Sequence, residues 1–167
     1  DKYELGVFPR RDLAIVKGKN ALLYDEYGNE YIDCISGNGV ANIGHANPVI
    51  TEALTEQSKL LITCPGIFYN DKKAELLEKL ISIAPSNLKK AFLCNSGTEA
   101  VEAALKFARY ATKRTGFICA NKAFHGRTMG ALSAISKKEY REGFDPLVPG
   151  FSFVTFNDFE KLEEKVN

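Results

Sequence analysis

The stretch NSGTEAVE, residues 95–102, predicts both a fold element and a binding site. Asn95, Ser96 and Thr98 carry small hydrogen-bonding side chains, and Gly97 lets the backbone approach a ligand closely. The alanine-rich segment that follows predicts a helix, whose unpaired N–H groups and positive dipole end would face this turn. The pattern therefore predicts a phosphate held by backbone N–H groups of Gly97 and Thr98 and by a hydroxyl.

The same turn also fits a structural interpretation. Ser96 and Glu99 have the spacing of a capping box, in which each side chain satisfies a free backbone donor of the other residue. Capping uses the same geometry as phosphate binding, so the two interpretations are compatible. The turn lacks the GxxxxGK(S/T) spacing of a nucleotide P-loop and is not a GxGxxG motif. A small cofactor with a single phosphate therefore fits it better than a triphosphate.

Short apolar runs alternate with helical patterns around this turn. The pattern predicts strands at residues 90–94, 117–120 and 151–156, helices at 97–114 and 129–135, and a last helix capped by Asn157 or Asp158. Strands that alternate with helices indicate an α/β fold with a largely parallel sheet from about residue 87 onward.

The N-terminal part has another pattern. Apolar runs separated by turn signals predict a small antiparallel unit of two or three strands, at residues 13–17, 21–24 and 31–33. A loop rich in Gly and Asn leads to Pro48, which suits the first turn of a helix over 48–61. A second helix would start at Asp71 as its cap and stop before Pro85. We expect a boundary near Gly44, with an N-terminal β segment at 1–44 and the first part of a larger domain at 45–167.

Composition excludes several classes of function. Twenty-two Lys and Arg against 21 Asp and Glu leave a net charge of +1, which offers no field for nucleic acid or a membrane surface. No apolar run is long enough to span a bilayer. The cysteines form no CxxC pair, and only two histidines accompany them, so we expect no metal site. We expect buried, reduced thiols at Cys34, Cys64, Cys94 and Cys119. Reduced thiols predict a cytoplasmic location.

A second polar group follows the strand predicted at residues 117–120. Phe124 stands beside the glycine of FHGRT, where an aromatic ring can stack on a flat ligand, and Arg127 offers a planar fork for a carboxylate. Each of these residues alone is more often structural, and His125 is as suited to holding a loop as to touching a ligand. Together they would lie at the carboxyl ends of neighbouring strands, where open α/β sheets bind ligands.

Four motifs in order carry a resemblance to a known family: YDEYGNEYIDCISGNGVANIGHANP, NSGTEAVEAALKFAR, FHGRTMGALSA and KEYREGFDPLVPGF. The chain resembles the class III, ornithine-type aminotransferases, which use pyridoxal 5'-phosphate (PLP) and have the PLP-dependent transferase type I fold. It looks most like acetylornithine aminotransferases and their relatives that act on lysine and ornithine precursors attached to a carrier protein. The 4-aminobutyrate aminotransferases more often carry Ala where Thr98 stands.

The resemblance implies roles for matching residues only. The turn Ser96-Gly97-Thr98 would hold the PLP phosphate, and Phe124 would stack on the pyridine ring with His125 beside it. Arg127 would bind the substrate α-carboxylate. In this family a lysine forms the Schiff base and an aspartate pairs with the pyridine nitrogen, and the resemblance places both beyond Asn167. The chain is thus expected to be the N-terminal part of the enzyme, without its catalytic residues and inactive by itself.

The implied reaction transfers the terminal amine of acetylornithine or a similar ω-amino substrate to 2-oxoglutarate in a ping-pong cycle. Family members are dimers, so the full protein is expected to be a homodimer, and this chain by itself is expected to aggregate. Other enzymes that share the scaffold stay open: a 4-aminobutyrate or ornithine aminotransferase, or a racemase. A non-catalytic, phosphate-binding α/β module is the alternative from another class.

Overall fold

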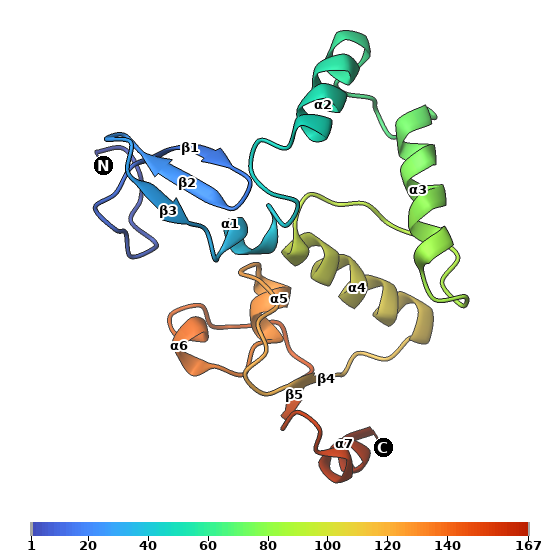
Figure 1. The fold of residues 1–167 in the computed structure, drawn as a ribbon. Coiled ribbons are helices and arrows are strands. Elements are labelled where there is room, and N and C mark those ends of the chain that lie inside the picture. The colour runs from blue at the N-terminus through green and yellow to red at the C-terminus, as the bar shows by residue number, and fades with distance from the viewer. Residues whose placement is uncertain (1, 167) are drawn as a thin grey trace. The chain divides into compact units, whose positions relative to one another are not determined.

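The computed structural model describes residues 2–166, which form two compact units, one ending at Ala74 and one starting at Glu75 (Figure 1). The first unit contains an antiparallel sheet, and the second contains a parallel pair of strands together with helices. The predicted α/β fold with a parallel sheet is therefore confirmed.

The sheet of the first unit is a three-stranded meander. Strands β1 (Ile15–Lys19), β2 (Leu22–Asp25) and β3 (Glu30–Ile32) pair antiparallel in the order β1-β2-β3. Leu22 of β2 is paired with Lys19 of β1 on one side and with Ile32 of β3 on the other. The predicted antiparallel unit is confirmed, because turn residues between short apolar runs allow neighbouring strands to pair at little entropic cost.

Asp25 organises the turn between β2 and β3. One carboxylate oxygen accepts the N–H groups of Tyr27 and Asn29 at 2.9 and 2.8 Å, and the other accepts the Asn29 amide and the Tyr31 hydroxyl. The side-chain hydrogen bond from Asn29 is the main reason that the pKa of Asp25 is lowered. Asp25 is 4% exposed, so these four donors are what makes burial of its charge tolerable.

Asp33 holds the loop that follows β3. Its carboxylate accepts the N–H groups of Ile35 and Ser36 and lies 2.6 Å from Nε2 of His45. His45 in turn packs on Gly18, where a Cβ would lie 2.7 Å from the His45 side chain. Part of the loop forms a short helical turn, α1 (Ser36–Gly39), whose four residues all have positive φ angles.

Helices α2 (Pro48–Leu60) and α3 (Asp71–Ile83) follow as predicted. The Asn47 side chain accepts the N–H of Val49 at 3.0 Å and caps α2. The cap predicted for α3 was wrong by one residue. The Asn70 side chain accepts the N–H of Lys73 at 2.9 Å, and Asp71 lies inside the first turn. In the first turn, the negative charge of Asp71 still stabilises the helix by interacting with its positive end.

The second unit has α4 (Gly97–Thr112), β4 (Phe117–Ala120), α5 (Met129–Ser133), α6 (Lys138–Arg141), β5 (Phe151–Val154) and α7 (Phe159–Val166). Strands β4 and β5 pair in parallel, with the rings of Phe117 and Phe151 stacked at 5.3 Å. The Arg109 guanidinium donates to the carbonyls of Thr115 and Pro149, which precede the two strands. The end of α4 is thereby attached to the start of the sheet.

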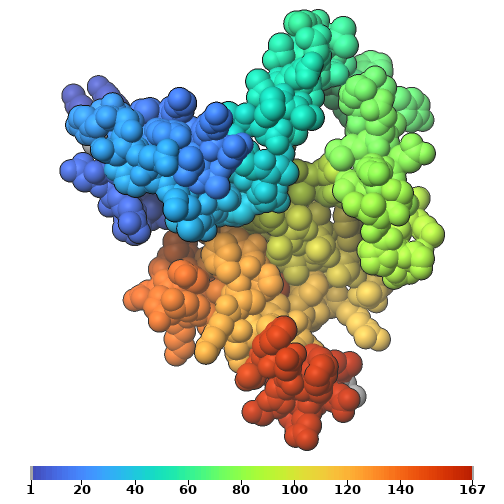
Figure 2. Space-filling model, viewed as in Figure 1, coloured from blue at the N-terminus to red at the C-terminus, as the bar shows by residue number. Residues whose placement is uncertain are grey.

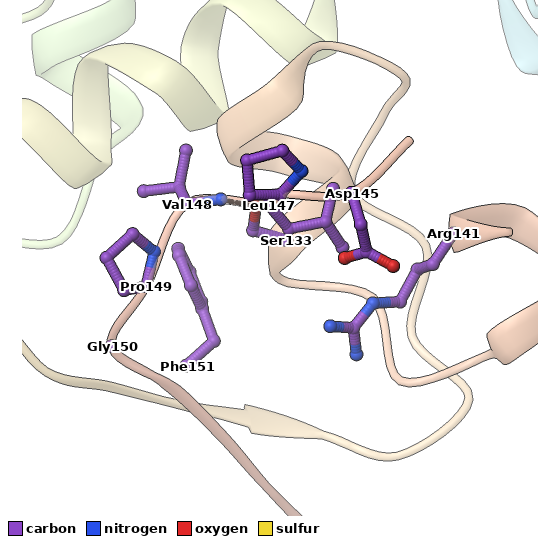
Figure 3. A pocket seen from close by; sticks show the side chains of 9 residues that line it. Ser133, Arg141, Asp145, Leu147, Val148, Pro149, Gly150 and Phe151 are labelled. Atoms are coloured by element: carbon purple, nitrogen blue, oxygen red, sulfur yellow. Dashed lines mark hydrogen bonds between the residues drawn. The ribbon is translucent and has the colours of Figure 1, made fainter. Parts of the chain in front are cut away.

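The buried core of the second unit is small and centres on α5 and the residues just after it. Its apolar members are Ala131, Leu132, Ala134, Ile135 and Val154. Ser133 lies among them, and its hydroxyl donates to the Met129 carbonyl at 2.6 Å. The same hydroxyl accepts the N–H of Val148 at 2.9 Å (Figure 3). Both lone-pair and proton requirements of this buried hydroxyl are met, so it ties α5 to the segment before β5.

The strand predicted at residues 90–94 is absent, and this prediction was wrong. A strand requires a neighbour for its backbone hydrogen bonds, and within residues 2–166 only β4 and β5 pair in this unit. The last helix is capped by Asp158, whose side chain accepts the N–H of Lys161. Of the two caps predicted for this helix, Asn157 and Asp158, the second is therefore the one observed.

Large apolar side chains are widely exposed in both units. Examples at more than half of full exposure are Val49, Leu54, Ile62, Phe92, Phe107, Tyr110 and Phe159. The cysteines are free thiols, as expected, but none is buried: Cys34 and Cys94 are exposed, and Cys64 and Cys119 are half-buried. The predicted burial was wrong because the core that these side chains would join is small.

Acid should weaken the first unit through Asp33. Hydrogen bonds, first that of His45 and then those of Ser36 and Ile35, lower the pKa of Asp33 from 3.8 to about 2. A carboxyl whose pKa is lowered by folding stabilises the fold above pH 3.8, and this contribution is lost as the pH falls toward 2. We expect Asp33→Asn to lower the melting temperature at pH 6, measured by circular dichroism. Between pH 4 and 2, the melting temperature of this variant should fall less than that of the wild type. The exposed Asp12→Asn is the control, and equal pH profiles for the two variants would contradict the assignment.

Candidate functional site

The two polar groups singled out in the sequence line one cavity of about 660 Å³ in the second unit. One wall is the first turn of α4 and the other is the loop after β4. The lining residues are Ser96, Gly97, Thr98, Val101, Phe124, His125, Gly126, Arg127 and Thr128. Every candidate site residue predicted from the sequence is thus brought to the same cavity. Figure 2 shows the atoms of α4 side by side with those of the segment that contains this loop and α5.

The turn before α4 is held by the predicted capping pair. The Ser96 hydroxyl accepts the N–H of Glu99 at 3.3 Å and donates to the Glu99 carboxylate at 2.9 Å. The same carboxylate accepts the N–H of Asn95 at 2.8 Å, one residue earlier than in the usual capping box. The hydrogen bond from Ser96 is the largest cause of the lowered pKa of Glu99. The anionic form of Glu99 therefore stabilises the turn.

The start of α4 suits an anion. The N–H groups of Gly97 and Thr98 have no intrahelical acceptor, and no other acceptor takes them among the described residues. A Cβ at Gly97 would meet no atom within 4 Å, so the backbone is open to an incoming group. The helix has 16 residues, and its positive end lies at this turn. This donor set fits a single phosphate group.

The opposite wall approaches α4 very closely. Gly126 has a φ of 129°, and a Cβ there would overlap the Thr98 side chain at 2.3 Å. The Thr98 and Thr128 hydroxyls are 2.8 Å apart, and Thr128 donates to Glu102 at 2.6 Å. Sequence reasoning gave no role to Glu102 or Thr128. The spacing of Thr98 and Glu102, four residues apart on one helix face, predicts that these two side chains are neighbours, whereas no pattern in the sequence points to Thr128.

Phe124 presents an exposed ring, 62% accessible, at the cavity. Its ring meets that of Tyr140 on α6 edge to face, with centroids 6.0 Å apart, and Lys137 lies over the Tyr140 ring. This contact fixes one edge of Phe124 and leaves ring area that a flat ligand can cover. Sequence reasoning missed Tyr140 as the support. His125 is half-buried, and the Arg127 side chain is exposed at the cavity rim.

Another cavity, of about 610 Å³, lies beside β5 (Figure 3). It is lined by Ser133, Arg141, Asp145 and residues 146–151, none of which the sequence predicts as a site. Within residues 2–166, no group of three His, Cys, Asp or Glu residues could hold a metal ion. In the same part of the chain, every helix is too short or too polar to cross a bilayer.

A side chain at Gly126 should disrupt the site. An alanine there would need a φ that L-residues rarely adopt and would overlap Thr98. We expect Gly126→Ala to cost roughly 2 kcal/mol or more of stability, from strain and overpacking together. Gly116→Ala is the control, because its Cβ would make only an ordinary contact at 3.9 Å. Denaturant unfolding measures both, and equal stability of the two variants would contradict the packing described.

The proteins similar to this chain include two curated aminotransferases and a solved aminotransferase structure. The chain is 46% identical to an acetylornithine aminotransferase of Methanopyrus kandleri over 167 residues, which is 100% of this chain and 43% of the relative. It is 44% identical to a LysW-aminoadipate semialdehyde transaminase of Deinococcus radiodurans, covering 99% of this chain and 39% of the relative. A Toxoplasma gondii ornithine aminotransferase structure, described as having partial PLP occupancy at its active site, superposes with a TM-score of 0.88 at 29% identity, over 98% of this chain and 40% of that one.

The chain thus spans about two fifths of the length of these relatives. The likeness to the ornithine aminotransferase confirms a PLP-dependent aminotransferase fold, of which this chain covers about two fifths. The family description of class III aminotransferases matches residues 7–167, nearly the whole chain, and the enzymes of that family are PLP-dependent. The resemblance drawn from the sequence motifs is confirmed: the chain belongs to the class III aminotransferase family.

Proposed function

We propose that the protein containing this chain is a PLP-dependent aminotransferase and that the cavity between α4 and the loop after β4 holds the cofactor. The observation that carries the proposal is the meeting of two independent groups on one cavity, an anion-binding turn and an aromatic ring beside an arginine. A phosphate and a flat ring on one small molecule are what such a pair accommodates. The three comparisons support the same assignment.

The roles of the chain's own residues follow from their positions. The N–H groups of Gly97 and Thr98 would bind the phosphate at the positive end of α4, with Ser96 holding the turn in shape. The exposed ring of Phe124 would cover one face of the cofactor ring, beside His125. PLP, when bound, takes up the amino group and withdraws electrons from the substrate carbon. Arg127 would hold a substrate carboxylate with its two-pronged guanidinium, which orients the amine toward the cofactor.

The substrate class is proposed from the relatives. One is named for acetylornithine and the other for LysW-aminoadipate semialdehyde, and both names describe a blocked or carrier-linked molecule with a nitrogen or aldehyde at its far end. We therefore propose a terminal amine of acetylornithine or a similar ω-amino compound as donor and 2-oxoglutarate as acceptor. An ornithine aminotransferase is the runner-up, favoured by the structural likeness to the Toxoplasma protein. A 4-aminobutyrate aminotransferase is less favoured because Thr98 stands in the turn.

The remaining parts of the proposal concern the rest of the protein. We propose that the Schiff-base lysine and the aspartate that pairs with the pyridine nitrogen lie outside this chain. We propose that the small and large domains are divided near Gly44, between residues 1–44 and 45–167. The exposed apolar side chains of α2, α3 and α4 would be covered by the rest of the protein and by a second copy in a homodimer. Free thiols at all four cysteines fit a reducing, cytoplasmic location.

Full-length protein should bind PLP and transaminate. We expect a PLP absorbance band in the visible region and turnover with acetylornithine faster than with ornithine or 4-aminobutyrate.

Arg127→Lys should raise KM for amino donor and 2-oxoglutarate by about tenfold or more, because one point charge replaces a two-pronged contact. PLP affinity should change less, and Arg114→Lys is the matched control. A protein that binds PLP without turnover would favour the non-catalytic module, and an unchanged KM would remove Arg127 from the substrate site.

The 167-residue chain alone should be inactive. It lacks the proposed lysine for the proton transfer, so we expect no transaminase activity above that of free PLP. Its exposed apolar faces should make it associate, measured by light scattering. Turnover by the purified chain would overturn the proposal that the catalytic lysine lies elsewhere, and a monodisperse monomer would contradict the expected association.

A further inference from the structure

Glu102 makes polar contacts that the proposed cofactor site does not explain by itself. Its Oε1 accepts the Thr128 hydroxyl at 2.6 Å and the N–H groups of Gly130 and Ala131 at 2.9 and 3.2 Å. The two N–H groups belong to the first turn of α5 and have no acceptor within that helix. Glu102 on α4 therefore caps α5 from a neighbouring helix, although α5 itself has no capping side chain at Thr128.

The backbone is shaped to admit this carboxylate. A Cβ at Gly130 would lie 2.5 Å from Oε2 and 2.7 Å from Oε1 of Glu102, so any larger residue would displace the contact. The segment that Glu102 grips continues directly into the buried core, from Ala131 to Ile135. The carboxylate is thereby anchored to the most buried part of the second unit, while Glu102 does not line the cavity itself.

The hydrogen bonds form a chain with one direction. Backbone N–H groups can only donate, so Oε1 of Glu102 is the acceptor for Gly130 and Ala131, and it takes a third proton from Thr128. Thr128 has spent its single proton and can only accept from Thr98, 2.8 Å away. The chain therefore runs from Thr98 through Thr128 to Glu102. In this arrangement the Thr98 hydroxyl proton is directed away from an incoming anion, and the N–H groups of Gly97 and Thr98 are left to meet it.

We propose that Glu102 is the positioning residue of the cofactor cavity. Through Thr128 it fixes the orientation of Thr98, and through α5 it fixes the distance between the turn before α4 and the loop that carries Phe124 and Arg127. Glu102 itself does not line the cavity, so it acts through Thr128 and α5. The inference rests on the proposed function, since it assigns Glu102 a role in holding the site for PLP.

The experiment measures the PLP dissociation constant of the full-length apoprotein by absorbance titration. Glu102→Leu should weaken binding at least about tenfold, because it removes a charged acceptor from three donors. Glu102→Gln should stay within about threefold, because its amide oxygen can take the place of Oε1. Thr128→Val should act like Glu102→Leu, whereas Thr128→Ser should stay near wild type. Glu164→Gln, an exposed carboxylate on α7, is the control and should leave the constant unchanged.

A double variant tests whether the two residues act as one chain. Glu102→Leu with Thr128→Val should bind PLP about as weakly as the weaker single variant, because the first change already breaks the path to Thr98. Multiplying effects would mean that the residues act independently and would overturn the proposal. So would wild-type affinity in a folded Glu102→Leu protein, or equal affinities for Thr128→Val and Thr128→Ser. The threonine pair decides the matter if the leucine variant does not fold.

Hydrogen exchange separates this proposal from the function on which it rests. In the apoprotein, Glu102→Leu should speed exchange at the N–H groups of Gly130 and Ala131 and leave those of β4 unchanged. Faster exchange together with weaker PLP binding supports the proposal. Faster exchange in a protein whose wild type binds no PLP would overturn the cofactor function and leave the contact as a structural clamp. Unchanged exchange and unchanged PLP affinity would overturn the positioning role alone.

Discussion

The hydrogen bonds from Glu102 to Thr128, Gly130 and Ala131 are the constraint on which the site in the second unit depends. They join α4 to the segment that supplies the buried core. At its other end α4 is held by Arg109, which donates to the carbonyls before β4 and β5. A helix is a stiff element, so fixing it at both of these points also fixes the turn at its start. The cavity walls therefore keep their separation without a large apolar core beneath them.

Polar contacts and close packing at glycine stabilise the cavity in this chain. The core is small, and many large apolar side chains are exposed. What holds the cavity is instead a set of specific contacts: the Ser96 and Glu99 pair, the hydroxyl chain to Glu102, and Gly126 against Thr98. Hydrogen bonds to charged groups are individually stronger than neutral ones, which suits a site that must keep its shape around an anion.

Local patterns predicted most of the regular elements. The antiparallel meander, α2 and β4 lie where alternation, turn residues and helical periodicity placed them. Two of the failures, the missing strand and the exposed cysteines, depend on partners distant in sequence. Residues 90–94 have the composition of a strand but no neighbouring strand to pair with among the described residues. The cysteines lie in apolar runs, yet their burial depends on what packs over them. The cap of α3 was misassigned because Asn70 and Asp71 are both good capping residues, and composition cannot choose between adjacent ones.

The sequence by itself determined the family and the candidate residues, because the order of the motifs and the types of their residues can be read without knowing any distance in space. Ser96, Gly97, Thr98, Phe124, His125 and Arg127 were identifiable from chemistry and from resemblance alone. Only the tertiary structure decided that they line one cavity, that Tyr140 supports Phe124, and that Glu102 reaches across to Thr128 and α5. The physical reason is that a hydrogen bond between residues 26 positions apart depends on the relative placement of two elements. No local propensity encodes that placement, whereas packing of the whole unit fixes it.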